Sequence, residues 1–125
     1  MNSNRPWIHS RIKSFGFAIE GIVTFFKTQH NAWIHAVAAV VVVVAGFILN
    51  VNNTEWCLLA IAIALVIISE MLNTAIEFLT DIVSPAIHPV AKKVKDVAAG
   101  AVLFAAITAA VIGGIVFIPK LLMLC

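Results

Sequence analysis

Residues 69–81 read Ser-Glu-Met-Leu-Asn-Thr-Ala-Ile-Glu-Phe-Leu-Thr-Asp and continue an apolar run, residues 56–68, that is typical of a membrane span. On a helix that turns about 100° per residue, the polar side chains of this stretch fall within an arc of roughly 100°. A carboxylate inside a membrane span costs roughly 2.5–3.5 kcal/mol, so such residues usually face a site or a partner. The stretch therefore predicts one polar face on an apolar helix. We call this face the acidic stripe; its members are Glu70, Asn73, Thr74, Glu77 and Asp81.

The composition of the whole chain agrees with a membrane protein. Of its 125 residues, 62% are hydrophobic and 11% are charged, against about 25% charged in a typical soluble domain. This length favours a single domain, residues 1–125, with a few spans. The net charge of +2 gives no indication of nucleic-acid binding. The spacing of Cys57 and Cys125 predicts free thiols, with neither a disulfide nor a metal site.

The N-terminal part of the chain predicts an amphipathic helix over residues 9–28. Apolar residues recur at spacings of three and four, while charged and hydroxyl residues occupy the other faces. This segment is too charged to span a bilayer, so we expect it to lie in the membrane interface with its apolar face in lipid. The alternative is packing against the protein's own spans. No cleavable signal pattern precedes the first long apolar run, so we expect that run to be retained.

Three longer apolar segments predict transmembrane helices at residues 32–49, 55–83 and 96–118. In a bilayer, the valine-rich first segment must be helical because every backbone group needs an internal partner. The second has about 29 residues, or roughly 43 Å at 1.5 Å per residue, and exceeds the ~30 Å hydrocarbon thickness. We expect a turn at 29–31, a basic connector at 90–95, and an end to the third span at Pro119.

The basic residues predict the orientation of these spans. Arg5, Arg11, Lys13 and Lys27 precede the first span, and three lysines lie between the second and third. The loop between the first two spans has none. The positive-inside rule then places the N-terminus inside and the C-terminus outside. The acidic stripe, the lysines and the amphipathic helix would meet at the cytoplasmic face of the membrane.

The acidic stripe is the strongest candidate for chemistry. Carboxylates on one face can hold Mg²⁺ through their oxygens, and a positioned Glu can act as a general base. The alternative is a polar seam between spans, with Asn73 bonding across helices. For Lys95 and Asp96, phosphate contact by the lysine competes with a simple helix N-cap by the aspartate. We interpret the histidines, His35 among them, as interfacial or structural.

Several blocks of this sequence closely resemble the prokaryotic diacylglycerol kinase family, which includes undecaprenol kinases. The blocks are residues 70–77, Asp81, His88-Pro89 and residues 91–103. The resemblance covers nearly the whole chain. It implies an all-α membrane protein with an N-terminal surface helix and three transmembrane helices, assembled as a homotrimer in the bacterial cytoplasmic membrane. It also implies a kinase that uses MgATP, with sites shared between neighbouring subunits at the cytoplasmic face.

The resemblance also implies roles for single residues. Glu70 would be the general base toward a lipid hydroxyl, and Asn73 would help to position it. Glu77 would bind the Mg²⁺ that bridges the ATP phosphates. Nucleotide contacts would come from Lys95, Asp96 and, as a weaker candidate, Arg11.

One position departs from the family pattern. Family members commonly place a second metal-binding glutamate just before the first span, where this chain has Gln29. A neutral amide should hold Mg²⁺ less well than a carboxylate. The sequence thus predicts a lipid kinase acting on diacylglycerol or undecaprenol, with a weak preference for the latter. The competing hypotheses are a proton- or cation-coupled transporter using Glu70 and a catalytically impaired scaffold.

Overall fold

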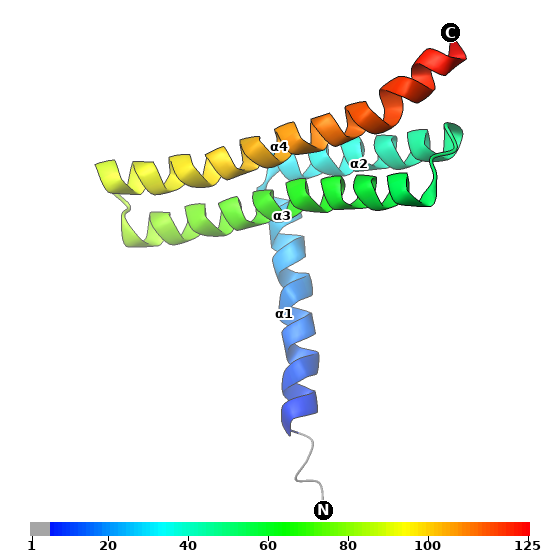
Figure 1. The fold of residues 1–125 in the computed structure, drawn as a ribbon. Coiled ribbons are helices and arrows are strands. Elements are labelled where there is room, and N and C mark those ends of the chain that lie inside the picture. The colour runs from blue at the N-terminus through cyan, green and yellow to red at the C-terminus, as the bar shows by residue number, and fades with distance from the viewer. Residues whose placement is uncertain (1–5) are drawn as a thin grey trace, which may run out of the picture.

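The computed structural model describes residues 6–125, and this part of the chain forms four α-helices (Figure 1). They are α1 (Pro6–Thr28), α2 (His30–Ile48), α3 (Asn53–Val83) and α4 (Pro89–Leu124). Helices α2, α3 and α4 are each long and apolar enough to cross a membrane. The prediction of an all-helical protein with three candidate spans is therefore confirmed.

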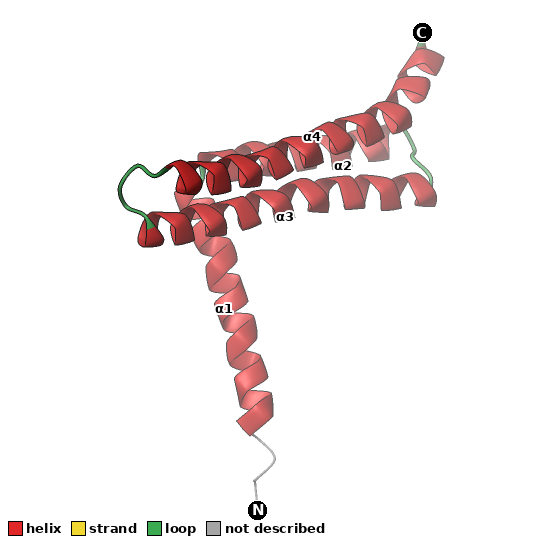
Figure 2. Cartoon of the chain, turned by 60° about the vertical axis from the view of Figure 1, so that its left-hand side comes forward, coloured by secondary structure: helices red, strands yellow, loops and turns green. Residues whose placement is uncertain are grey.

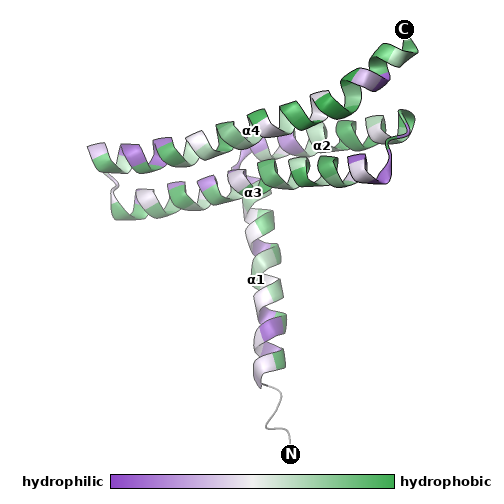
Figure 3. Ribbon diagram, viewed as in Figure 1, coloured by the Kyte–Doolittle hydropathy of each residue, from purple (hydrophilic) through white to green (hydrophobic). Residues whose placement is uncertain are grey.

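Helices α3 and α4 form a long hairpin, joined by the loop of residues 84–88, and run side by side along most of their length (Figures 1 and 2). Helix α2 lies beside the half of α3 that is remote from the loop of residues 84–88. Helix α1 projects away from the other three helices. Figure 3 shows that hydrophilic residues gather on α1 and at the loop end of the hairpin, whereas the opposite half is apolar. The polar end of α3 therefore extends beyond the junction of α1 and α2.

Most of α1 is exposed and does not pack against the other helices. Phe25 is its one buried residue within the described range, whereas Ile12 and Phe15 of the predicted apolar face are 63% and 73% exposed. Helix α1 is anchored through its last turns, where the Trp33 ring nitrogen donates to the Phe26 carbonyl at 2.9 Å. In the single chain, the N-terminal helix therefore does not pack along the spans, which was the alternative to a position in the membrane interface.

The turn between α2 and α3 is fixed by local hydrogen bonds. The Asn52 side chain accepts from the Glu55 amide at 2.9 Å, and the Glu55 carboxylate accepts from the Asn52 amide at 3.0 Å. This reciprocal capping box satisfies two of the free amides at a helix start. It explains why α3 begins at Asn53, two residues earlier than predicted. Asn50 has a positive φ of 52°, a conformation that asparagine tolerates better than most residues.

A small apolar core closes this end of the hairpin. Val51, Leu59 and Val116 are buried together, and the core is bordered by Val42, Trp56, Ile112 and Phe117. The Lys120 ammonium lies 3.1 Å from the Glu55 carboxylate and links α4 to α3 beside it. Most other large apolar side chains of the spans are exposed in the single chain, as expected for surfaces that contact lipid or other subunits.

Both ends of α4 differ from the prediction. The helix begins at Pro89, so the predicted connector 90–95 is helical. His88 is the N-cap, its ring nitrogen accepts from the Val90 amide at 3.1 Å, and proline at the first helical position has its φ already set. At the other end α4 continues through Pro119 to Leu124. Proline removes one helical hydrogen bond and commonly bends a helix, and Figure 1 shows the last turns of α4 bending away.

The other boundaries shift slightly. Gln29 alone separates α1 from α2, so the turn predicted at 29–31 is shorter. Helix α2 covers 30–48 instead of 32–49, and α1 begins at Pro6, not at residue 9. Such shifts of one to three residues fall where helix ends fray or are capped.

The close approach of α2 to α3 depends on Gly46. A Cβ atom added there would lie 2.5 Å from the Trp56 ring. We expect Gly46→Ala to lower the free energy of unfolding by about 1–3 kcal/mol, because overpacking forces neighbouring side chains to move. Unfolding in detergent micelles, followed by circular dichroism, measures this. Gly16→Ala is the control, since its Cβ would meet nothing within 4 Å. Equal unfolding midpoints for the two variants would contradict the packing described.

Candidate active site

The centre of the candidate site is a carboxylate buried between helices. Within residues 6–125, Glu70 is the one charged residue that is buried, with 8% of its surface exposed. Its Oε1 lies 2.9 Å from Nε2 of His35, which projects from α2. A carboxylate held between apolar helices needs a hydrogen-bonding partner to offset its lost hydration, and His35 supplies one.

Asn73 and Glu77 continue the polar face one and two turns further along α3. The Asn73 amide nitrogen donates to Oε1 of Glu77 at 3.3 Å. The Asn73 Oδ1 atom is buried and has no hydrogen-bond partner in the single chain. A buried carbonyl oxygen without a partner is costly, so this acceptor is available for a donor or a cation from a ligand.

Asp81 and Lys95 join the loop ends of α3 and α4. The Lys95 ammonium lies 2.5 Å from Oδ1 of Asp81, and both side chains are well exposed. Lys95 and Asp96, which are neighbours in the sequence, do not pair with each other. Adjacent residues on a helix point in different directions, and Asp96 instead pairs with Lys92 at 2.6 Å. Asp96 is also no N-cap, because α4 begins seven residues earlier, at Pro89.

Lys95 and Asp96 nevertheless border the same polar cavity. This cavity has a volume of about 320 Å³ and lies beside the loop of residues 84–88. Its charged lining consists of Asp81, Lys92, Lys95 and Asp96. The structure thus brings together two predicted nucleotide-binding residues at the polar end of the hairpin.

A second, apolar cavity is bordered by His35, the partner of Glu70. It has a volume of about 130 Å³ between α2, α3 and α4, and small residues such as Ala62 and Gly113 line much of it. His35 is its one polar side chain. The His35–Glu70 pair therefore stands where an apolar space between the spans meets the acidic stripe.

The fifth member of the predicted stripe, Thr74, is directed elsewhere. Its hydroxyl donates to the Glu70 carbonyl of the same helix at 2.9 Å. Its side chain borders a cavity formed with Gly21, Thr24 and Phe25 of α1. Residues of the stripe accordingly face all three other helices: Glu70 faces α2, Thr74 faces α1 and Asp81 faces α4.

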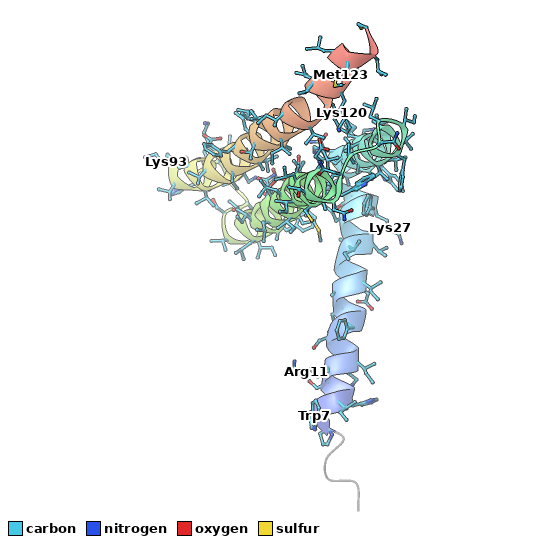
Figure 4. The ribbon with its side chains drawn as sticks, turned by 45° about the vertical axis from the view of Figure 1, so that its right-hand side comes forward. Trp7, Arg11, Lys27, Lys93, Lys120 and Met123 are labelled. Atoms are coloured by element: carbon cyan, nitrogen blue, oxygen red, sulfur yellow. The ribbon has the colours of Figure 1, made fainter. Side chains whose placement is uncertain are left out.

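Two predicted site residues lie apart from these groups in the single chain. Arg11 lies near the free end of α1, far from Lys93 at the start of α4 (Figure 4). Gln29 is the N-cap residue of α2, and its amide nitrogen lies 3.4 Å from the Thr28 hydroxyl. Neither residue forms a hydrogen bond or ion pair with the acidic stripe within the described chain, so a role in the same site would require a neighbouring copy or movement of α1.

The residues present fit a hard cation shared with a nucleotide better than a fixed metal centre. Among residues 6–125, no three His, Cys, Asp or Glu side chains converge on a metal position. Mg²⁺ in kinases is usually held by one or two carboxylates and by the phosphates of the substrate. The Glu77 carboxylate and the unpartnered Asn73 Oδ1, one helical turn apart, are oxygen donors of the required kind.

His35 is the residue that sequence reasoning missed. The sequence predicted only an interfacial or structural role for it, and its partner Glu70 lies 35 residues further along the chain. A signal existed, because His35 and Glu70 are polar residues in consecutive spans that must run antiparallel. Polar side chains in neighbouring spans commonly bond across helices.

Three apolar helices with carboxylates, an amide and a lysine at one end define a membrane protein with a polar site between its spans. Comparison with known proteins narrows the class. The sequence pattern of the prokaryotic diacylglycerol kinase family matches residues 16–117. An undecaprenol kinase of Bacillus subtilis (strain 168) is 40% identical over 118 residues, which covers 94% of this chain and 96% of that protein.

Two diacylglycerol kinases are also similar. That of Synechocystis sp. is 43% identical over 112 residues, which covers 89% of this chain and 64% of that longer protein. That of Escherichia coli (strain K12) is 31% identical over 111 residues, which covers 89% of this chain and 91% of that protein. The chain belongs to the prokaryotic diacylglycerol kinase family, a family of lipid kinases.

Proposed function

We propose that this chain is an integral-membrane lipid kinase that transfers the γ-phosphate of ATP to a lipid alcohol. The observation that carries the proposal is the order of polar groups along α3. The buried carboxylate of Glu70 contacts His35, which borders an apolar cavity, and Asp81 at the far end borders a polar cavity with Lys95. A lipid alcohol reaches the first from the bilayer, and ATP reaches the second from water.

In the proposed reaction each of these residues has a separate role. Glu70 accepts the proton of the lipid hydroxyl as its oxygen bonds to the γ-phosphorus. The bond from that phosphorus to the bridging oxygen breaks, and ADP leaves. Phosphoryl transfer depends chiefly on positioning and charge neutralisation. Asn73 positions Glu70 or the nucleotide, and Lys95 and Asp96 contact the nucleotide, with Arg11 as a further candidate.

Mg²⁺ bound with ATP would neutralise charge on the phosphates, and Glu77 is the residue proposed to hold it. Gln29 is the weaker candidate for a second ligand, because its amide is neutral. We further propose that the protein is a homotrimer in the cytoplasmic membrane, with its N-terminus and site on the cytoplasmic side. The distribution of lysines and arginines supports this orientation, and the unpartnered Asn73 oxygen and the distant Arg11 support a site completed by a neighbour.

The substrate is diacylglycerol or undecaprenol, since relatives named for both are about equally similar in sequence. The test uses the full chain in detergent micelles with Mg²⁺, ATP labelled at the γ-phosphate, and each lipid in turn. We expect labelled lipid with at least one of the two alcohols, and the ratio of the two rates decides the preference. No labelled product with either lipid would overturn the proposal and favour the transporter hypothesis.

Gln29 offers a second measurement. We expect Gln29→Glu to lower the Mg²⁺ concentration for half-maximal rate by roughly an order of magnitude, because a carboxylate adds charge that a hard cation prefers. The substitution is structurally mild, since the Gln29 side chain makes no capping hydrogen bond to α2. Gln29→Ala is the control. Identical Mg²⁺ dependence in both variants would remove Gln29 from the metal site.

A further inference from the structure

Within the described residues, the acidic stripe makes one polar contact with α2, the contact between Glu70 and His35. It joins residues 35 positions apart, from two different candidate membrane helices, at 2.9 Å. The His35 side chain is 24% exposed and that of Glu70 is 11% exposed. A hydrogen bond in such a shielded place is stronger and more directional than one in water.

The geometry of this contact leaves one oxygen of Glu70 free. His35 approaches Oε1 through Nε2, so a carboxylate at position 70 requires the proton on Nε2. The other carboxylate oxygen then remains available to accept a proton from a substrate. A glutamate side chain has several freely rotating bonds, and a single bond to a ring held on another helix restricts them. His35 therefore fixes the direction in which Glu70 presents its basic oxygen.

The surroundings of the His35 ring favour its contact with Glu70. His35 borders the apolar cavity between α2, α3 and α4, whose small side chains leave the ring no competing polar partner on that wall. On α2 the histidine lies in the second turn, close to the junction with α1. A displacement of α2 would move the ring and with it the carboxylate.

We propose that His35 is a positioning residue for Glu70, holding this carboxylate in the orientation in which it removes the proton from the lipid alcohol. This inference rests on the proposed kinase function and assigns a role to a residue outside the motifs of the acidic stripe. His35 does not touch the reacting phosphate; it acts through Glu70.

The first test is kinetic. We expect His35→Leu to lower kcat by about 10–100-fold, the usual cost of losing a partner that orients a functional ligand, with the KM for ATP changed less than about twofold. His35→Gln, whose amide can still donate to Glu70, should recover most of the lost kcat. His30→Leu is the matched control, because His30 is an exposed histidine at the start of the same helix. Unfolding midpoints of all variants test whether the fold is retained.

The second test does not depend on activity. In full-length protein labelled with ¹⁵N-histidine, the His35 Nε2 signal, assigned by its loss in His35→Gln, should report a protonated Nε2. It should shift in Glu70→Gln while the signals of the other three histidines stay unchanged.

The outcomes separate the two proposals. A wild-type protein that phosphorylates no lipid overturns the kinase function. An active wild type whose kcat is unchanged in His35→Leu overturns the positioning role, as does an His35 signal that is insensitive to Glu70→Gln. A His35→Gln variant as slow as His35→Leu also contradicts it, because the amide preserves the donor that the role requires.

Discussion

Replacing Glu70 by glutamine is expected to lower kcat for lipid phosphorylation by about 10²–10⁴-fold, the usual contribution of a general base. Glutamine has nearly the same shape as glutamate, and its carbonyl oxygen can still accept from His35, so the α2–α3 contact is retained. It cannot take up the proton of the lipid hydroxyl. The rate of labelled-lipid formation at saturating ATP and lipid measures the effect.

Glu55→Gln is the matched control for this experiment. Glu55 is a carboxylate on the same helix, but it pairs with Lys120 at the opposite end of the hairpin. Its replacement weakens a structural contact and should leave kcat within about twofold. If Glu70→Gln and Glu55→Gln have similar rates, Glu70 is not the base, and its burial against His35 is structural.

Replacing Glu77 by glutamine is expected to produce the second largest loss. It removes the carboxylate proposed to hold Mg²⁺ and leaves only the neutral Asn73 oxygen beside that position. We expect the rate at limiting Mg²⁺ to fall by on the order of 10²-fold, comparable to the loss of one preorganised charge-stabilising group. Unlike Glu70→Gln, part of this loss should be recovered by raising Mg²⁺, because the defect lies in binding the cation.

The Mg²⁺ dependence of the rate at fixed ATP checks this prediction. Glu20→Gln on the exposed part of α1 is a suitable control, since Glu20 is an acidic residue that lies outside the acidic stripe. A Glu77→Gln variant whose deficit is the same at every Mg²⁺ concentration would assign Glu77 another role, such as supporting the Asn73 side chain through their 3.3 Å hydrogen bond.

The spans and the acidic stripe could be predicted because their signals are local. An apolar run of sufficient length requires a membrane helix, and polar residues recurring every three or four positions must share a helix face. The positions of Glu70, Asn73 and Glu77 along one side of α3 followed from that rule. The start of α4 could not be predicted in this way, because residues 90–95 were expected to form a connector and a proline usually interrupts a helix. At position 89 it follows an N-cap histidine and begins the helix instead.

The pairings between helices could not be derived from spacing along the chain. Lys95 was predicted to contact phosphate, with no partner on α3 named, but in the structure it reaches Asp81 across the hairpin. His35 was assigned no partner, although it contacts Glu70. Each of these contacts depends on the register between two helices, which the packing of small and large side chains sets, as at Gly46 and Trp56. A pattern within one helix contains no information about that register.

The two ion pairs that link α3 to α4 have a mechanical consequence. Glu55–Lys120 and Asp81–Lys95 lie near opposite ends of the hairpin, whose two helices pack along most of their length, so we expect these helices to move as one rigid unit. Helix α2 is attached to that unit by the capped turn at one end and by His35 toward the other. Thermal rocking of α2 would then change the geometry around Glu70, whereas the Asp81–Lys95 pair involves only α3 and α4. We therefore expect the surroundings of Glu70 to respond to movement of α2 more than those of Asp81 and Lys95 do.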